Sequence, residues 1–315
     1  MTKELDLKQL HDIRSKPLKI KLFGKHIQHS KSPLLQNYSL KRLGLDWKYE
    51  LFDSDDIALF KQFLNSDDCA GAGVTMPNKV RMFPHVDIVD DGAKAVGAIN
   101  TIYIRYDNIT NEKKFIGTNT DTIGIKNSFL YNAADLVKLS KDQGRAGLVY
   151  GGGGACRSAV YSLYQFLGCS KVYVINRFAE EVVAVRDEMI KGGFTGEIIH
   201  ISTPQQAESL ETKPLLIVCT VPDFEPQSDK EKLARQTLQV FIDAKEKGAV
   251  LEMCYHPKPT TRLYAAFEKG DWKVISGIEA MIYQGLAQEV LWTGYKWDDI
   301  PVSEVIEYVY SNLEE

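Results

Sequence analysis

Leu148–Cys156, with the sequence LVYGGGGAC, is the stretch that decides the expected fold. Its apolar start predicts a buried strand, its glycines predict a tight turn, and the residues from Ala155 onward predict a helix. In a dinucleotide-binding turn of the type G-x-G-x-x-G/A, Gly151 makes the bend. Gly153 lets the backbone approach a pyrophosphate at the helix N-terminus, next to Gly154. A glycine turn with a purely structural role is the alternative.

Strand-like and helix-like segments alternate after this turn, which predicts parallel strands covered on both faces. The expected strands are 148–150, 171–175, 197–201, 215–218, 249–253 and 274–275. We therefore expect a Rossmann-type, doubly wound parallel sheet in a dinucleotide-binding domain of residues 141–276. Its ligand would lie at the carboxyl ends of the strands.

The second of these strands leads into Asn176-Arg177, where an acidic residue would accept a hydrogen bond from a ribose 2′-hydroxyl. Arg177 instead suits a 2′-phosphate or stacks on adenine, unless it is a solvated arginine at a helix start. Glu180 and Glu181 would repel a 2′-phosphate, although a helix beginning near Phe178 would turn Glu181 toward solvent. On balance the segment favours NADP over NAD, with measurable use of both.

The N-terminal part mixes strand and helix signals and predicts an α/β domain with a mixed sheet. Strands are expected at 18–23, 49–52 and 72–75, and helices at 33–43 and 55–64. The segments 98–106 and 114–116 flank a polar turn and predict a hairpin. We assign residues 1–140 to a substrate-binding catalytic domain, completed by C-terminal helices within 277–315 that return to it.

Two residues of this part suit proton transfer. Lys79 follows a short buried strand in VTMPNK, and Asp121 closes the segment GTNTD. An ammonium and a carboxylate at one site can move a proton to or from a hydroxyl group. Taken singly, Lys79 fits a solvated surface lysine and Asp121 a helix cap. Their occurrence together with further polar segments favours a catalytic pair.

Four further segments supply neutral hydrogen-bonding groups. Ser30 and Ser32 precede a helix N-terminus, where a carboxylate would be favoured, and Asn100 begins a strand. Tyr255 lies in a proline-containing loop, and Gln284 lies in a C-terminal helix. Helix capping is the simpler role for the two serines. Because no arginine cluster is present, the set suits a small polyhydroxylated acid with one carboxylate.

Composition limits the remaining classes of function. With 315 residues, 44% hydrophobic and 25% charged, the chain suits two globular domains. A net charge of −4 predicts binding to neither nucleic acid nor an anionic membrane. Five cysteines without paired spacing predict reduced thiols in the cytoplasm, and six histidines without ligand spacing predict no metal site. We expect no secretory signal and no membrane-spanning segment, and the sequence does not indicate an oligomeric state.

Together these segments resemble the shikimate/quinate dehydrogenase family over about residues 18–294. The motifs that carry the resemblance are HSKSP, VTMPNK, GAINT, GTNTD, GGGGACRSA, Thr220-Val221-Pro222, CYHPKPT and YQG. The resemblance implies NAD(P)-dependent interconversion of shikimate or quinate and the 3-dehydro ketone, with Lys79 and Asp121 as the catalytic pair. It implies substrate contacts from Ser30, Ser32, Thr75, Asn100, Tyr255 and Gln284. It implies cofactor contacts from Gly151, Gly153, Gly154, Ala155, Asn176, Arg177, Thr220 and Gly277.

Two positions depart from the family's pattern. Gly73 stands where the family usually has asparagine before Val-Thr, and the second basic residue of NADP-preferring members is missing after Arg177. The two serines of HSKSP resemble the shikimate-favouring pattern, but the residues do not separate shikimate from quinate or a biosynthetic from a catabolic role. A metabolite-sensing regulator without turnover is the alternative function. A bifolate-type dehydrogenase would explain the glycine turn but not HSKSP and NTD together.

Overall fold

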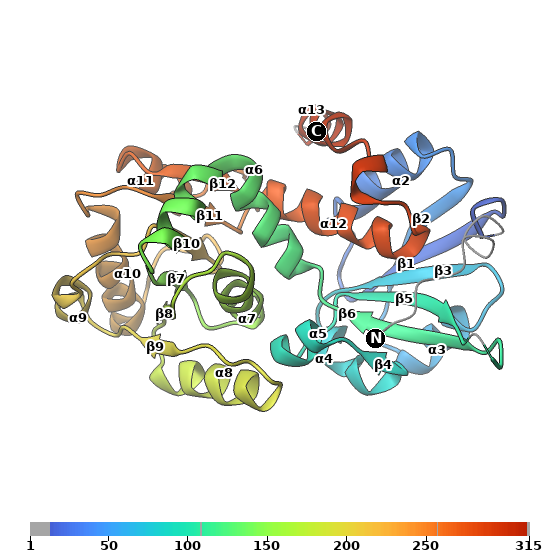
Figure 1. Cartoon of the computed structure of the whole chain (residues 1–315), viewed down its shortest axis with the longest axis horizontal. Helices are drawn as coiled ribbons and strands as arrows, with labels where there is room; N and C mark the ends of the chain where they lie inside the picture. Colours follow the sequence, from blue (N-terminus) through green and yellow to red (C-terminus); the bar gives the residue numbers. More distant parts are fainter. Residues whose placement is uncertain (1–12, 108, 257, 314–315) are drawn as a thin grey trace. The chain divides into compact units, whose positions relative to one another are not determined.

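The computed structural model describes residues 13–107, 109–256 and 258–313. The chain divides into two compact units, one of residues 1–120 with 284–315 and one of residues 121–283 (Figure 1). The chain therefore enters the second unit once and returns to the first through its C-terminal segment.

The first unit contains a mixed sheet with the strand order β2-β1-β3-β5-β6-β4. The strands are β1 (Leu18–Gly24), β2 (Trp47–Asp53), β3 (Cys69–Val74), β4 (Ile88–Val89), β5 (Thr101–Tyr106) and β6 (Lys113–Thr118). β1 pairs in parallel with β2 and β3, and β4 pairs in parallel with β6. β5 is antiparallel to β3 and β6, which confirms the predicted hairpin.

Helices cover both faces of this sheet. They are α2 (Ser32–Arg42), α3 (Ile57–Leu64), α4 (Asn78–Arg81), η1 (Phe83–His85), α5 (Asp91–Val96), α12 (Gly277–Thr293) from Gln284 onward, η3 (Trp297–Asp299) and α13 (Val302–Ser311). One apolar cluster joins Leu40 of α2 and Trp292 of α12 to β1 and β2. The other joins Phe60 of α3 and Ala93 of α5 to the opposite face. Successive side chains of a strand point to opposite faces, so the same strands supply residues to both clusters.

The second unit contains a parallel sheet with the order β12-β11-β10-β7-β8-β9. The strands are β7 (Gly147–Tyr150), β8 (Val172–Ile175), β9 (Ile198–His200), β10 (Leu216–Cys219), β11 (Ala249–Glu252) and β12 (Lys273–Ser276). The order reverses between β7 and β10, which makes the sheet doubly wound as predicted. Four of the six strands are buried at every residue, as expected for parallel strands under two helical layers.

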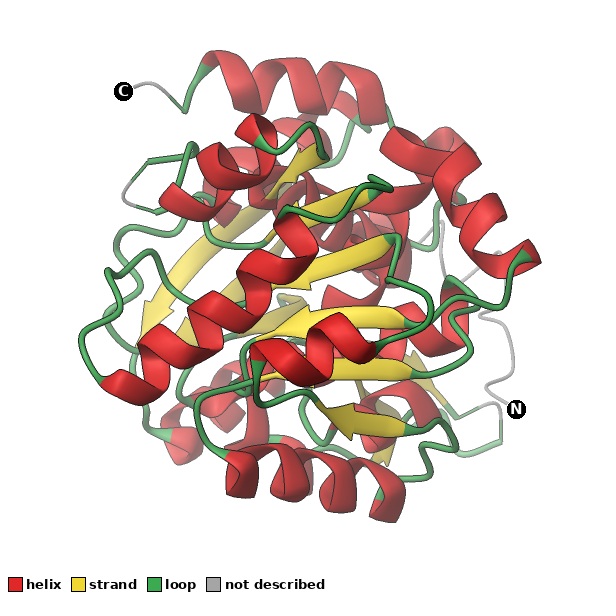
Figure 2. Ribbon diagram, turned by 90° about the vertical axis from the view of Figure 1, so that its left-hand side faces the viewer, coloured by secondary structure: helices red, strands yellow, loops and turns green. Residues whose placement is uncertain are grey.

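The helices of the second unit are α6 (Asp121–Asp142), α7 (Gly154–Tyr161), the π-helical turn η2 (Ser162–Phe166), α8 (Ala179–Lys191), α9 (Pro204–Ser209), α10 (Asp229–Ile242) and α11 (Arg262–Lys269) (Figure 2). Side chains of α9, α10 and α11 share one apolar cluster with the sheet. α6 packs against β10, β11, β12 and α7. This packing places the start of the second compact unit at Asp121 rather than at the expected residue 141.

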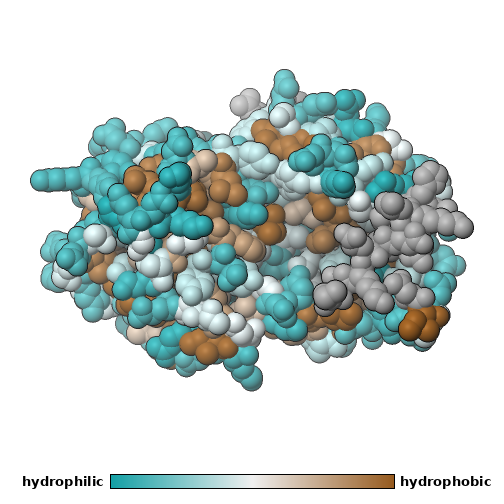
Figure 3. Space-filling view, in the orientation of Figure 1, coloured by the Kyte–Doolittle hydropathy of each residue, from teal (hydrophilic) through white to brown (hydrophobic). Residues whose placement is uncertain are grey.

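Within the described residues, no helix is long and apolar enough to cross a membrane. In the face seen in Figure 3, hydrophilic residues are spread over the surface and hydrophobic residues occur in separate groups.

Candidate functional site

Asn100 is the centre of a buried polar cluster in the first unit. Its Nδ2 donates to Thr120 Oγ1 at 3.0 Å and to Gln284 Oε1 at 3.2 Å. Its Oδ1 accepts hydrogen bonds from Thr101 Oγ1 at 2.7 Å and from the Thr120 backbone N–H at 2.7 Å. Asn100, Thr101 and Thr120 are all at most 3% exposed. Both ends of the Asn100 amide are therefore fixed, and Asn100 in turn fixes the Oε1 end of Gln284.

Two further glutamines extend this cluster. Gln288 Nε2 donates to Thr101 Oγ1 at 3.0 Å, and Gln36 Nε2 donates to Gln288 Oε1 at 3.2 Å. Gln36 also donates to the Gly285 carbonyl at 3.0 Å. The cluster thus ties α2 and α12 to the start of β5, although these segments are far apart in the sequence. It holds the half-buried Gln284 in one orientation.

Ser32 and Gly73 both lie next to the hydroxyl of Tyr49. The Tyr49 hydroxyl hydrogen-bonds Ser32, and burial raises the pKa of this phenol. A Cβ atom on Gly73 would lie 2.7 Å from the Tyr49 hydroxyl and 3.1 Å from Leu22 Cδ1. Asn37 of α2 fixes the backbone of Tyr49. Its Oδ1 accepts a hydrogen bond from the Tyr49 N–H at 2.8 Å, and its Nδ2 donates one to the Tyr49 carbonyl at 2.9 Å. A larger residue at position 73 would therefore displace the Tyr49 hydroxyl.

Ser30, Thr75 and Lys79 all lie on loops or short elements of the first unit. Ser30 Oγ accepts a hydrogen bond from the Ser32 backbone N–H at 3.3 Å. Thr75 follows β3, and its N–H donates to the Phe23 carbonyl at 2.9 Å. Lys79 lies in α4, where its carbonyl accepts from the Ile99 N–H at 3.0 Å. All three side chains are half-buried, so they are accessible to a ligand.

Asp121, Tyr255 and Gly277 belong to the second unit. Asp121 is the first residue of α6, and Tyr255 lies in the loop after β11, where burial raises the pKa of its phenol. Gly277 begins α12, and a Cβ atom there would lie 2.3 Å from the Met253 carbonyl oxygen. Gly277 therefore permits a close approach of two backbone segments.

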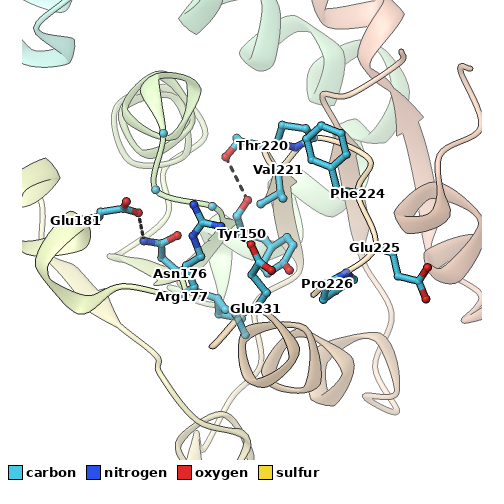
Figure 4. A pocket seen from close by; sticks show the side chains of 16 residues that line it. Tyr150, Asn176, Arg177, Glu181, Thr220, Val221, Phe224, Glu225, Pro226 and Glu231 are labelled. Carbon is cyan, nitrogen blue, oxygen red and sulfur yellow. Dashed lines mark hydrogen bonds and ion pairs between the residues drawn. The ribbon is translucent and has the colours of Figure 1, made fainter. Parts of the chain in front are cut away.

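A cavity of about 400 Å³ opens at the carboxyl ends of β7, β8 and β10 (Figure 4). Its lining includes Gly151, Gly153 and Thr220, three of the residues expected to contact a cofactor. Gly151 has φ +119°, and a Cβ atom there would lie 2.5 Å from Thr220 Oγ1, so only glycine suits the turn. Gly154 and Ala155 open α7 but do not line the cavity.

The glycine loop fits a dinucleotide phosphate. Apart from the adjacent residues of the chain and the backbone of α7, no heavy atom lies within 4 Å of the position that a Cβ would take on Gly153 or Gly154. The N-terminus of α7 follows directly, so backbone N–H groups and the helix dipole favour an anion there. This open space beside a helix N-terminus is the arrangement that a pyrophosphate requires.

Charged side chains also line the cavity (Figure 4). Arg177 forms an ion pair with Glu231 at the start of α10, and Asn176 Nδ2 donates to Glu181 Oε2 at 2.6 Å. Glu181 is exposed and also lines the cavity. α8 begins at Ala179, so Glu181 lies in its first turn, from which its carboxylate accepts the hydrogen bond from Asn176.

Several lining residues were not among the expected cofactor contacts. They are Tyr150, Ile175, Val221, Pro222, Phe224, Glu225, Pro226, Glu231 and Ala234. The Thr-Val-Pro turn marks the position of Val221 and Pro222. Glu231 carries the further signal of a capping box with Ser228, three residues before it in SDKE. That signal predicts a helix start but not a position beside Arg177.

Two buried carboxyl groups lie outside the predicted sets. Burial raises the pKa of Glu289 in the first unit and of Glu252 in the second to about 8. Glu289 accepts a hydrogen bond from Ser39 Oγ at 2.5 Å, and Glu252 accepts one from the Cys254 N–H at 3.0 Å. Residues 13–107, 109–256 and 258–313 contain no group of three or more His, Cys, Asp or Glu residues suited to a metal ion.

Comparisons with known proteins agree on one family. Residues 22–102 match the family model described as the shikimate dehydrogenase substrate binding domain. The quinate dehydrogenase of Emericella nidulans is 37% identical over 289 residues, which cover 87% of this chain and 87% of that protein.

Solved structures show the same fold. The dehydroquinate dehydratase and shikimate dehydrogenase of S. pombe AroM is 31% identical, with a TM-score of 0.76 over 94% of this chain and 53% of that chain. The quinate dehydrogenase of Corynebacterium glutamicum in complex with NAD has a TM-score of 0.75 over 94% of this chain and 100% of that chain. Its 19% identity shows the fold alone. The chain spans only 17 to 19% of the pentafunctional AROM polypeptides that it also matches.

Proposed function

Because the chain belongs to the shikimate/quinate dehydrogenase family, we propose that it oxidises a ring hydroxyl of shikimate or quinate to the 3-dehydro ketone, reversibly and with NAD(P). The observation that carries this proposal is the open glycine turn at the carboxyl ends of β7, β8 and β10, in a chain that also has the family's substrate motifs. When bound, NAD(P)⁺ accepts hydride from the carbon that bears the hydroxyl. The five cysteines are free thiols, which supports a cytoplasmic setting.

We assign substrate binding to the first unit. Gln284 and Asn100 belong to one fixed cluster, and Ser30, Ser32 and Thr75 are half-buried hydrogen-bonding groups of the same unit. Neutral groups held in one orientation suit vicinal hydroxyls, because each hydroxyl both donates and accepts hydrogen bonds. The start of α2 suits the substrate carboxylate. Tyr255, in the second unit, is proposed as a further contact by resemblance.

We assign the proton to Lys79 and Asp121. In the oxidation, the substrate O–H breaks and its proton passes to the Lys79 amine while the C–O bond becomes a carbonyl. Asp121 orients Lys79 and balances its charge. This assignment rests on the family resemblance of the segments VTMPNK and GTNTD. In the reverse direction the ammonium returns the proton to the ketone oxygen.

We assign dinucleotide binding to the second unit. The N–H groups after Gly151 and Gly153 would hold the pyrophosphate, and the carboxyl-end loops of β8 and β10 would hold the adenosine side. Asn176, Arg177 and Thr220 line the same cavity. Gly277 would contribute by letting the backbone pass close to Met253. The choice between NAD and NADP depends on what Arg177 contacts.

The test is a set of initial-rate assays with shikimate and quinate, each with NAD and NADP, followed by the absorbance of the reduced cofactor. We expect turnover with at least one of the four combinations. Tight binding of shikimate or quinate without turnover in any combination would favour the alternative, a metabolite-sensing regulator that keeps the fold.

A further inference from the structure

Arg177 does not face the cavity as an isolated cation. Its guanidinium is paired with the Glu231 carboxylate, which lies beside it in Figure 4. The two side chains are 46% and 30% exposed. The two residues are 54 positions apart and come from the loop after β8 and from the first turn of α10. The pair therefore bridges two loops that line the cavity.

Glu231 is fixed by bonds that do not depend on Arg177. Its Oε2 accepts backbone hydrogen bonds from Ser228 at 2.9 Å and from Gln227 at 3.0 Å, and its own N–H donates to Ser228 Oγ at 3.3 Å. This capping box leaves Oε1 directed at Arg177. The hydrogen bonds from Ser228 and Gln227 lower the pKa of Glu231 to about 2, so the carboxylate stays ionised at neutral pH.

Two other carboxylates line the same cavity. Glu181 accepts a hydrogen bond from Asn176 at 2.6 Å, and Glu225 lies on the loop after β10. A 2′-phosphate that approached Arg177 would have to displace Glu231 and enter a cavity lined by three carboxylates. A ribose 2′-hydroxyl meets no such repulsion, because it can donate a hydrogen bond to a carboxylate.

We propose that Glu231 is a specificity-determining residue that withholds Arg177 from a 2′-phosphate, so that the cavity binds NAD in preference to NADP. The inference rests on the proposed binding of a nicotinamide dinucleotide in the second unit. This preference is the reverse of the one that Arg177 alone would give. Discrimination against NADP comes from the repulsion between the Glu231 carboxylate and a 2′-phosphate, and from the ion pair that already engages the Arg177 guanidinium.

Isothermal titration of the purified full chain with NAD and with NADP tests the inference without turnover. We expect NAD to bind wild type at least tenfold more tightly than NADP. Glu231→Gln keeps an oxygen for the capping box but removes the charge. It should tighten NADP binding at least tenfold and change NAD binding less than threefold. Glu180→Gln removes a carboxylate that does not line the cavity and should leave both affinities within twofold.

The outcomes separate the inference from the proposed function. Binding of both dinucleotides with an unchanged affinity ratio in Glu231→Gln overturns the inference alone. Tighter binding of NADP than of NAD by wild type also overturns it, and this measurement needs no variant. Binding of neither dinucleotide overturns the proposed function and the inference together.

Discussion

The two units present their polar groups in different ways. In the first unit, Asn100 and Thr120 are buried side chains that hydrogen-bond each other and Gln284. In the second unit, the turn at Gly151 presents backbone groups, and Arg177 presents an exposed positive charge on a loop. A preorganised buried cluster recognises one arrangement of hydroxyls, whereas an exposed ion pair can be altered by one substitution. Substrate selection should therefore tolerate fewer changes than cofactor selection.

The largest expected effect lies in the first unit, at the proposed proton-transfer group. Lys79→Ala should lower kcat by about 10²–10⁴-fold and change KM less, because a positioned acid–base group acts in the transition state. Steady-state kinetics measure this effect. Lys94→Ala, which removes an exposed lysine of the same unit paired with Asp91, is the control and should leave kcat unchanged. A Lys79→Ala enzyme with more than about a tenth of the wild-type rate would contradict the assignment.

The buried carboxyl of Glu289 tests whether the interior of the first unit excludes water. Because the folded-state pKa is raised from 4.5 to about 8, the native state holds a proton that the unfolded state releases. The stability that Glu289 contributes should therefore be fully present below about pH 4.5 and be lost as pH rises through about 8. Glu289→Gln should stabilise the protein at pH 9 by on the order of 2–4 kcal/mol relative to wild type, with little effect at pH 5.

Thermal unfolding of wild type and Glu289→Gln between pH 5 and 9 measures this difference. Glu252 contributes a slope of the same sign in the second unit, so the comparison of the two proteins isolates Glu289. Parallel stability curves for the two proteins would show that the carboxyl is not held protonated.

A smaller effect is expected at Gly73. Gly73→Ala places a methyl group against the Tyr49 hydroxyl and should cost about 1–3 kcal/mol of stability and raise KM, since Ser32 is displaced. Tyr49→Phe removes the hydroxyl and should restore part of the stability of the Gly73→Ala protein. Denaturant unfolding of the two single variants and the double variant forms the cycle. Additive losses would show that Tyr49 and Gly73 do not interact.

The smallest effect is expected at the ion pair of the second unit. In a Glu231→Gln background, Arg177→Ala should weaken NADP binding by about tenfold and leave NAD binding nearly unchanged, because the guanidinium is then available to a phosphate. In the wild-type background the same change should cost less. Equal losses for NAD and NADP would instead indicate that Arg177 stacks on adenine or supports the fold.

Local patterns predicted most of the fold. The strands of the second unit were predicted because parallel strands under two helical layers form continuous apolar runs, as Val172–Ile175 does. The two-residue strand β4 and the short helix α5 gave no such signal, since a few residues cannot show a period. The β5–β6 hairpin was recognisable from its polar turn.

The candidate site was predictable only in part. Gly151 and Thr220 were marked by motifs, but nothing local connects Gln36 with Gln288, or Arg177 with Glu231. Such contacts depend on how helices pack, which a residue pattern does not encode. Glu181 shows the same limit, because its hydrogen bond with Asn176 depends on how the loop after β8 meets the first turn of α8.

The central claim is that a ring hydroxyl is oxidised by hydride transfer to a dinucleotide held by the second unit. Shikimate and quinate deuterated at C3 test it directly when the reduced cofactor is analysed by mass spectrometry after turnover. The account predicts that the reduced cofactor gains one mass unit over that formed from unlabelled substrate, and that the ring product is the 3-dehydro ketone. A reduced cofactor without the label, or no reduced cofactor with either acid, would contradict it.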